Sequence, residues 1–286
     1  MKKYLTDWRL IIIAVLLFSN LFVWAITFTA PAVVLTVAFL NVGQGDAIFI
    51  EAPNGNQVLI DGGAGRKILS ELGKVMPFYD RSIDLIIATH PDSDHIGGLL
   101  PVFDNYQVAG LMRPEMGCQN AVCEVLEAKV AAEPAKEILA SQGEKIILGD
   151  GVELKILSPS GPMPGKDTNI ASVVAKLTYG RTSFIFTGDA PRAIENYLVA
   201  KEGKNLDVDI LKVGHHGSDT SSAPEFLAAT SPEVAVISVG KDNRYGHPKA
   251  SVLDLLTKSG AKIFRTDEAG TIVFKTDGVE IISPKL

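Results

Sequence analysis

The sequence predicts an α/β fold in which two mixed β-sheets are flanked by helices, preceded by one apolar N-terminal helix. Three observations carry this prediction. Apolar, strand-like runs come in two series, and each series is followed by helical segments. Side chains that can bind metals stand repeatedly where such a run ends. Residues 10–28 form an uncharged apolar stretch, so we expect an N-terminal segment over residues 1–32 and one domain over residues 33–286.

The composition is that of an ordinary globular protein with an acidic charge balance. Of the 286 residues, 47% are hydrophobic and 21% are charged, and the formal net charge is −6. This balance argues against a broad basic surface that grips duplex nucleic acid through many phosphates. It still allows a local basic groove, or a metal ion that supplies the positive charge itself.

The apolar stretch over residues 10–28 is long enough to cross a bilayer as a helix, which takes about 20 residues. Lys2, Lys3 and Arg9 precede it, and this basic flank predicts that the N-terminus stays in the cytoplasm. We therefore expect a single-pass protein of the cell membrane whose domain lies outside the cytoplasm. A cleaved signal peptide is the alternative, but the stretch exceeds the usual apolar region of about 7–15 residues, and residues 29–31 offer a poor cleavage site.

The first series of strands follows this segment directly. Short runs rich in Val, Ile and Leu predict strands, and Pro53-Asn54-Gly55 predicts a turn between two of them. A stretch rich in Ala, Glu and Lys predicts a solvent-facing helix that Pro134 can break. In order, we expect strands at residues 33–40, 47–50, 57–60, 83–88 and 108–112, and helices at residues 66–73, 95–103 and 121–140.

The second series begins with a hairpin through Gly149-Asp150-Gly151, a typical turn sequence. A loop rich in Pro and Gly spans residues 158–169, and a long loop of this kind is usually either the rim of a functional site or disordered. In order, we expect strands at residues 145–148, 152–158, 172–178, 182–186, 208–213 and 234–239, helices at residues 193–201, 224–229 and 251–258, and three short strands up to residue 282.

The chain contains two cysteines, Cys118 and Cys123. The four residues between them allow a small disulfide loop, which would persist only in an oxidising compartment and would fit a location outside the cytoplasm. Two unpaired thiols are the alternative. A cysteine pair of this spacing without a nearby histidine is weak evidence for zinc.

Residues 89–98, Thr-His-Pro-Asp-Ser-Asp-His-Ile-Gly-Gly, form the motif around which the chain is organised. His90, Asp92, Asp94 and His95 stand between a predicted strand and a predicted helix, where open α/β folds bind their ligands. Imidazole and carboxylate together bind divalent metals. Helix capping would explain one acidic residue here, but it does not explain the whole cluster.

Other candidate ligands also stand at strand ends. Every histidine of the chain lies in a Gly-rich or Asp-rich loop after an apolar run. Asp61 precedes two glycines, although a simple turn explains that tripeptide equally well. The remaining candidates are Asp189, His215, His216 and His247.

Together these motifs resemble the metallo-β-lactamase-fold hydrolases. Asn-Val-Gly-Gln-Gly-Asp, Thr-His-Pro-Asp-Ser-Asp-His-Ile-Gly-Gly, Phe-Thr-Gly-Asp, Lys-Val-Gly-His-His-Gly-Ser and Tyr-Gly-His-Pro occur in this order. They look like one branch, the C-terminal domain of the ComEC/Rec2 DNA-uptake proteins, in a stand-alone form. The resemblance covers residues 33–283 and implies a four-layer αββα sandwich of two mixed sheets between helices.

Two departures from the general family pattern bear on the metal. Asp92 stands where the family at large has a second histidine. A third metal-binding histidine is absent between Leu148 and Phe184, where Asn169 or Asp167 is the nearest polar candidate. Both changes replace nitrogen by oxygen, which shifts the preference from Zn²⁺ toward Mn²⁺ or Mg²⁺. We therefore expect one or two divalent ions.

The resemblance also implies a metal-binding role for several residues. His90 and Asp92 would hold one ion, and Asp94 and His95 a second. Asp189 would bridge the two ions, and His247 would complete the outer side of the metal site. Asp61 would orient the histidine loop, residues 89–98, by accepting a hydrogen bond outside the ligand set.

The expected catalytic residues are Asp94, His215 and His216. Either of the two adjacent histidines, with Ser218 and Ser222, would grip the phosphate or protonate the leaving oxygen, and Asn169 would contact the substrate. For His215 and His216 the alternative is an exposed turn in which one histidine serves only as a cap. For Ser222 the alternative is an N-cap role at the start of a helix.

The function that the resemblance implies is a metal-dependent phosphodiesterase or nuclease. It would act on single-stranded DNA or nucleotides through metal-activated water, at the outer face of the membrane. One alternative is a hydrolase of small esters, lactones or β-lactams, although such sites usually use zinc and more imidazoles. Another is a catalytically silent metal-binding module. One spanning segment cannot form a pore, so a role in DNA uptake would need a separate membrane channel protein as partner.

Overall fold

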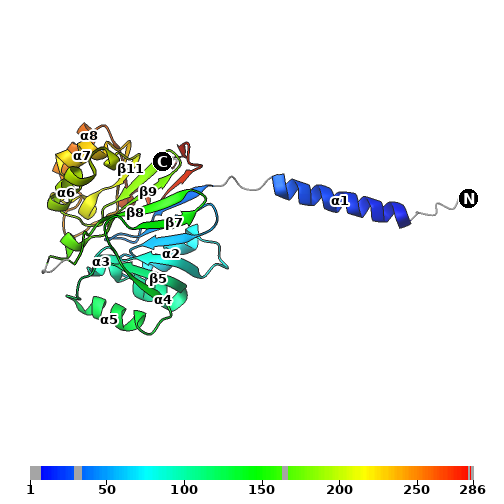
Figure 1. The fold of residues 1–286 in the computed structure, drawn as a ribbon, viewed down its shortest axis with the longest axis horizontal. Helices are drawn as coiled ribbons and strands as arrows, with labels where there is room; N and C mark the ends of the chain where they lie inside the picture. The colour runs from blue at the N-terminus through cyan, green and yellow to red at the C-terminus, as the bar shows by residue number, and fades with distance from the viewer. Residues whose placement is uncertain (1–7, 29–33, 163–166, 283, 285–286) are drawn as a thin grey trace, which may run out of the picture. The chain divides into compact units, whose positions relative to one another are not determined.

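The computed structural model describes residues 8–28, 34–162, 167–282 and 284 (Figure 1). Contacts divide the chain into two units, Met1–Val33 and Val34–Leu286. Three features of the sequence prediction lie outside the described residues: Lys2 and Lys3, the boundary between residues 32 and 33, and residues 163–166 of the predicted Pro- and Gly-rich loop.

The first unit contains helix α1, Trp8–Phe28, over the apolar N-terminal stretch. Its described side chains, up to Phe22, are exposed. Among the residues described in the structure, however, no helix combines the length and the apolar character that crossing a membrane requires. The predicted membrane-spanning helix is therefore not supported.

The second unit is built on two mixed sheets. In the eight-stranded sheet, β3 to β6 run parallel to one another and the remaining pairs are antiparallel. Its strands in spatial order are β15 (Ile281–Ile282), β14 (Ile272–Thr276), β1 (Leu35–Phe39), β2 (Ile48–Glu51), β3 (Gln57–Ile60), β4 (Ser82–Ile87), β5 (Gln107–Arg113) and β6 (Lys136–Leu139).

In the seven-stranded sheet, β10 to β13 run parallel and β7 to β10 form antiparallel pairs. Its strands in spatial order are β13 (Lys262–Arg265), β12 (Val234–Ile237), β11 (Ile210–Lys212), β10 (Thr182–Phe186), β9 (Val174–Tyr179), β8 (Val152–Ser158) and β7 (Lys145–Gly149).

Helices cover the outer face of each sheet, as the ribbon shows for both groups (Figure 1). The first group packs on the eight-stranded sheet: α2 (Lys67–Val75), α3 (Ser93–Ile96), α4 (Leu99–Asn105) and α5 (Ala121–Val130). The second packs on the seven-stranded sheet: α6 (Arg192–Glu202), α7 (Pro224–Thr230) and α8 (Ala250–Lys258). The short helix α9, Thr266–Ala269, follows β13.

Three apolar clusters hold these layers together. One lies between the two sheets, and one lies under each group of helices. Strand β1 contributes side chains to two of these clusters. Val37 and Phe39 belong to the cluster between the sheets, while Ala38 belongs to the cluster under the helices of the eight-stranded sheet. Successive side chains of a strand point to opposite faces, so a strand buried on both faces is apolar throughout. The predicted two mixed sheets flanked by helices are confirmed.

Two predicted helices differ from the structure. The helix expected over residues 121–140 ends at Val130, and residues 136–139 instead form the edge strand β6. The helix expected over residues 95–103 is divided into α3 and α4 at Gly97-Gly98. A side chain at Gly98 would overlap the carbonyl oxygen of Gly62, so this approach of two loops requires glycine.

Candidate metal centre

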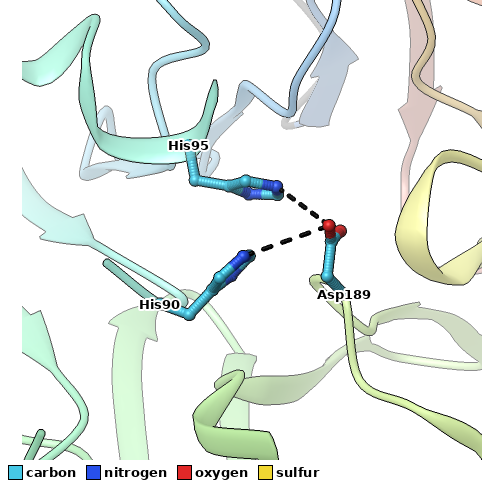
Figure 2. Close-up of side chains that lie close together, drawn as sticks. All are labelled: His90, His95 and Asp189. Carbon is cyan, nitrogen blue, oxygen red and sulfur yellow. Dashed lines mark ion pairs between the residues drawn. The ribbon is translucent and has the colours of Figure 1, made fainter. Parts of the chain in front are cut away.

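The carboxylate of Asp189 lies at the centre of the candidate site. It follows β10 directly, and its Oδ2 is surrounded by the Nε2 atoms of histidines from two loops, those after β4 and β11. Figure 2 shows two of these rings pointing toward it, His90 from the loop after β4 and His95 from the short helix α3. The distances to Asp189 Oδ2 are 3.3 Å from His95, 3.5 Å from His216, 3.6 Å from His215 and 4.0 Å from His90.

Each of these imidazoles is oriented by a contact to its other nitrogen. The Nδ1 partners are Thr89 Oγ1 for His90 (3.0 Å), Asp61 Oδ2 for His95 (2.8 Å), Thr220 Oγ1 for His215 (2.8 Å) and the carbonyl oxygen of Ser238 for His216 (2.9 Å). Such outer contacts fix the tautomer and leave Nε2 as the nitrogen that faces Asp189.

Asp61 joins the end of β3 to the histidine loop. Its Oδ1 accepts a hydrogen bond from the backbone N–H of Thr89 (2.8 Å) and its Oδ2 one from the Thr89 hydroxyl (2.7 Å). The same Oδ2 contacts His95 Nδ1, and the residue is fully buried. Asp61 has a φ of 57°, a left-handed conformation that Asp tolerates better than most residues. Its geometry fits the predicted orienting role.

The loop after β11 also has unusual backbone geometry. His215 and His216 have φ angles of 48° and 54°, and both stand in the 3₁₀ turn Gly214–Gly217. The backbone N–H of His215 donates to the carbonyl oxygen of Gly188 (3.2 Å), next to Asp189. Adjacent left-handed residues that carry side chains cost free energy, and such strain clusters at functional sites.

Two carboxylates of the histidine loop stand on the more exposed side of the cluster. Asp94 Oδ2 lies 3.5 Å from His216 Nε2, and Asp92 Oδ2 lies 3.8 Å from His90 Nε2. The hydroxyl of Thr168 donates to Asp92 Oδ1 (2.6 Å), so the loop before β9 reaches this side of the site.

The buried pair Asp46 and Lys212 had no predicted role in the site. Lys212 Nζ forms an ion pair with Asp46 and lies 3.8 Å from Asp189 Oδ1. Asp46 Oδ1 lies 3.3 Å from His216 Nδ1. The available signal in the sequence was a single lysine inside the apolar run over residues 208–213, because a buried charge needs a partner.

These charges shift one another's pKa values. Burial lowers the pKa of His90, and the neighbouring charge of His95 lowers it further, to about 4. Burial acts in the same direction on His216, but Asp189 and Asp46 outweigh it and raise its pKa to about 9. Burial raises the pKa of Asp189, but His216 and His95 outweigh it and hold that pKa well below its usual value. Among the protein's own groups, ionised Asp189 therefore faces a protonated imidazole at His216 and a neutral one at His90 at neutral pH.

His247 lies at the outer side of the cluster. Its ring centroid is 5.8 Å from that of His215, and the residue is half-buried. Burial and the neighbouring His215 lower its pKa to about 4. Its ring is therefore neutral near pH 7 and free to act as a ligand or a hydrogen-bonding group.

The predicted substrate contacts fall in three different places. Ser218 is buried, and its Oγ accepts a hydrogen bond from the Thr220 hydroxyl (3.0 Å), which contacts His215. Ser222 is also buried, and its backbone N–H donates to Glu195 on α6 rather than to the histidine cluster. Asn169 is half-buried in the turn Thr168–Ala171. The role of each in substrate binding stays a prediction.

The side chains of the cluster fit divalent metal ions. Within the described residues, His90 Nε2, His95 Nε2, His216 Nε2 and Asp189 Oδ1 are buried and have no hydrogen-bond partner. Buried polar atoms are rarely left so, and a metal is one of the groups that satisfies them. The ligand atoms of His90, His95 and Asp189 lie within 4.8 Å of one another, as do those of Asp94, His95 and His216. These two ligand sets share His95, and Asp189, a member of the first, also forms a group with Asp46 and His216.

A model of the metallo-beta-lactamase superfamily matches residues 40–241, and the chain belongs to this superfamily. The fold also resembles solved structures. CmlA, a diiron beta-hydroxylase from Streptomyces venezuelae, superposes with a TM-score of 0.55 at 16% identity, over 87% of this chain and 54% of that one. The metallo-beta-lactamase fold protein YhfI from Bacillus subtilis gives a TM-score of 0.54 at 11% identity, over 80% of this chain and 95% of that one. At such identities the likeness shows the fold alone.

Closer relatives in sequence include a competence protein. ComE operon protein 3 of Bacillus subtilis (strain 168) is 35% identical, over 84% of this chain and 33% of that protein. Competence protein ComA of Neisseria gonorrhoeae is 33% identical, over 83% of this chain and 32% of that protein. Recombination protein 2 of Haemophilus influenzae is 29% identical, over 82% of this chain and 28% of that protein. The chain thus spans about a third of the length of these relatives, and the predicted resemblance is confirmed.

Proposed function

We propose that this protein is a metal-dependent phosphodiesterase that acts on single-stranded DNA or nucleotides. The observation that carries the proposal is the convergence of imidazole Nε2 atoms on Asp189 Oδ2, with distances from 3.3 to 4.0 Å. A buried set of nitrogen and oxygen ligands of this kind supports hydrolysis by a bound divalent metal. The similarity to competence proteins supports a nucleic-acid substrate.

In this proposal His90, His95 and Asp189 would hold one ion, and Asp94 and His216 would hold a second. This arrangement gives His216 a ligand role, whereas the sequence prediction placed it at the phosphate. Divalent ions bound here lower the pKa of a water molecule to near neutrality and stabilise charge on phosphodiester oxygens.

The chain's own residues prepare this chemistry. Asp61 and Thr89 hold the histidine loop in place, so the ligands need little reorganisation when a metal binds. Lys212 balances the buried charge of Asp46. His247, neutral near pH 7, stands at the open side, where it can hydrogen-bond a phosphate oxygen.

Mn²⁺ is the ion that we propose, with Mg²⁺ and Zn²⁺ as alternatives. Carboxylates suit Mg²⁺ and Mn²⁺, whereas imidazoles suit borderline transition metals, and this site offers both kinds of ligand. We also propose that the protein works in an oxidising compartment outside the cytoplasm. The disulfide between Cys118 and Cys123 supports this location, because such bonds are rare in a reducing cytoplasm.

The test is cleavage of a single-stranded oligonucleotide labelled at either end, with each of the three metals in turn. Asp94→Ala should abolish cleavage, because Asp94 belongs to a candidate ligand set. Asp104→Ala is the matched control, since that exposed aspartate on α4 pairs with Lys129. If the two variants have the same melting temperature, the loss of cleavage in Asp94→Ala does not come from unfolding.

Cleavage that needs metal and disappears only in Asp94→Ala supports the proposal. An unchanged oligonucleotide with every metal, while the protein binds those metals, would refute it. Small esters, lactones and β-lactams, tested in parallel, would then identify the other kind of hydrolase.

A further inference from the structure

The loop between β12 and α8 carries an exposed aromatic side chain beside the candidate metal centre. Tyr245 is 46% exposed, and its ring stacks on His247 with centroids 5.9 Å apart and an interplanar angle of 12°. The ring of His247 lies 5.8 Å from that of His215, whose Nε2 is 3.6 Å from Asp189 Oδ2. A line of rings therefore leads from Asp189 to the surface.

Arg244 extends this line with a cation. Its Nη2 donates a hydrogen bond to the Tyr245 hydroxyl (2.8 Å), and its guanidinium carbon lies 5.0 Å from the centroid of that ring. The hydrogen bond to Tyr245 and the negative charge of Asp94 both raise the pKa of Arg244. Arg244 is itself exposed to solvent, so its guanidinium is accessible to a ligand.

The loop that presents these side chains is held by its own hydrogen bonds. Asn243 Nδ2 donates to the carbonyl oxygens of Gly240 (3.0 Å) and His247 (2.7 Å), and its Oδ1 accepts from the N–H of His247 (3.0 Å). Lys249 Nζ donates to the carbonyl oxygen of Tyr245 (2.8 Å). Because the backbone is fixed in this way, a ligand that binds the exposed side chains loses little affinity to ordering the loop.

The charge of this loop is opposite to that of the chain as a whole. The formal net charge of the chain is −6, yet the loop carries Lys241, Arg244 and Lys249 against the single acid Asp242. A local excess of positive charge beside a metal site favours a polyanionic ligand.

We propose that Arg244 and Tyr245 form a nucleotide-binding subsite of the metal centre. One base stacks on the Arg244–Tyr245 pair, and the free N–H groups of Arg244 bind the phosphate of a neighbouring nucleotide. This inference rests on the proposed function and deepens it, because a base reaches such a platform only when it is unstacked and unpaired. The subsite would therefore select single strands over duplexes.

The chemistry of both side chains matches this role. Stacking on an aromatic ring tolerates every base, because each base has a π-face, and strengthens binding about 5- to 150-fold per base. A guanidinium both stacks on bases and binds phosphate through two parallel hydrogen bonds. Lysine would supply only the charge.

The first test compares two chromogenic diesters with the same leaving group. Thymidine 5′-(p-nitrophenyl phosphate) has a base, and methyl p-nitrophenyl phosphate has none. Tyr245→Ala should raise KM about tenfold for the first, the lower part of the stacking range, and leave KM for the second unchanged. Tyr245→Phe keeps the ring but loses the hydroxyl that binds Arg244, so its KM for the first diester should lie closer to that of the wild type than to that of Tyr245→Ala. Tyr79→Ala removes a 75% exposed tyrosine at the other end of β4 and is the matched control.

The second test measures binding without turnover. Anisotropy of a labelled thymidine oligonucleotide is followed over a range of salt concentrations, with Ca²⁺ in place of Mn²⁺. Arg244→Gln should weaken binding and reduce the slope of log K against log salt by about 0.7, the value for one phosphate on a single strand. Arg181→Gln, in the turn before β10, should leave the slope unchanged.

The outcomes separate this inference from the proposed function. If the wild type hydrolyses neither diester, the proposed function fails, and the binding test alone decides the subsite. If both diesters respond alike to Tyr245→Ala, or the salt slope is unchanged in Arg244→Gln, the subsite is overturned while hydrolysis stands.

Discussion

The ammonium group of Lys212 lies 3.8 Å from Oδ1 of Asp189, the carboxylate whose other oxygen faces the imidazoles. Lys212 also pairs with Asp46 and donates to the carbonyl oxygen of Gly188 (2.8 Å). Its side chain is fully buried, so solvent screens none of these contacts. Lys212 is therefore a buried cation beside the candidate metal centre. Its charge offsets the repulsion between the carboxylates of Asp46 and Asp189.

Replacing Lys212 should destabilise the protein strongly. Lys212→Met leaves the buried carboxylate of Asp46 with His216 as its cationic neighbour, and removing one partner of a buried pair typically costs about 3–5 kcal/mol. Urea unfolding in EDTA measures the loss. Lys176→Met is the control, because Lys176 donates to the carbonyl oxygens of Asn205 and Asp207. Equal losses for the two variants would contradict the account of Lys212.

Asp61→Asn should weaken metal binding while the backbone stays intact. Asparagine tolerates the left-handed φ of 57° at this position. It lacks the second carboxylate oxygen that accepts from both Thr89 and His95, and losing such an outer partner typically costs about 10–100-fold in metal affinity. Calorimetric titration with Mn²⁺ measures the affinity. Asp84→Asn, which removes an acceptor from the N–H of Gln57 at the far end of β4, should leave it unchanged.

Stability in EDTA should fall as the pH rises from 6.5 to about 9. The pKa of His216 is raised from 6.5 to about 9, so its proton stabilises the folded state fully below pH 6.5, and this contribution is lost as the pH rises through about 9. A bound metal needs the neutral imidazole, so saturating Mn²⁺ should reverse the trend. Thermal unfolding at several pH values measures both effects, and His216→Gln should flatten the EDTA curve. A slope that His216→Gln leaves unaltered would argue against this assignment.

The sequence predicted the fold better than it predicted which side chains contact one another in the candidate site. The two sheets follow from apolar runs and turn residues, which are local signals, and the residues after β4 and β11 were found because their polar clusters stand out. Strand β6 was missed because Lys-Glu-Ile-Leu is compatible with a helix, and pairing with β5 decides its conformation. The Asp46–Lys212 pair joins residues far apart in the chain, so no local pattern predicts it.

The disulfide between Cys118 and Cys123 should contribute modestly to stability and little to catalysis. The sequence left open whether these two thiols are paired, and in the structure they form a disulfide. For a loop this short, with a sequence separation of 5, the chain-entropy model gives about 2 kcal/mol. Urea unfolding of the double variant Cys118→Ser/Cys123→Ser measures the loss. Asn120 Nδ2 donates to the carbonyl oxygen of Pro91, a contact in which neither sulfur takes part, so cleavage activity should persist; its disappearance would show that the disulfide positions the histidine loop.

The central claim is that the imidazoles around Asp189 hold divalent metal ions. Anomalous diffraction from a crystal loaded with Mn²⁺ tests it most directly. The account predicts strong peaks between Asp189 Oδ2 and the Nε2 atoms of His90, His95 and His216, about 3.5–4 Å apart if two ions bind. A crystal that shows Mn²⁺ only elsewhere, with these imidazoles still paired to Asp189 alone, would contradict it.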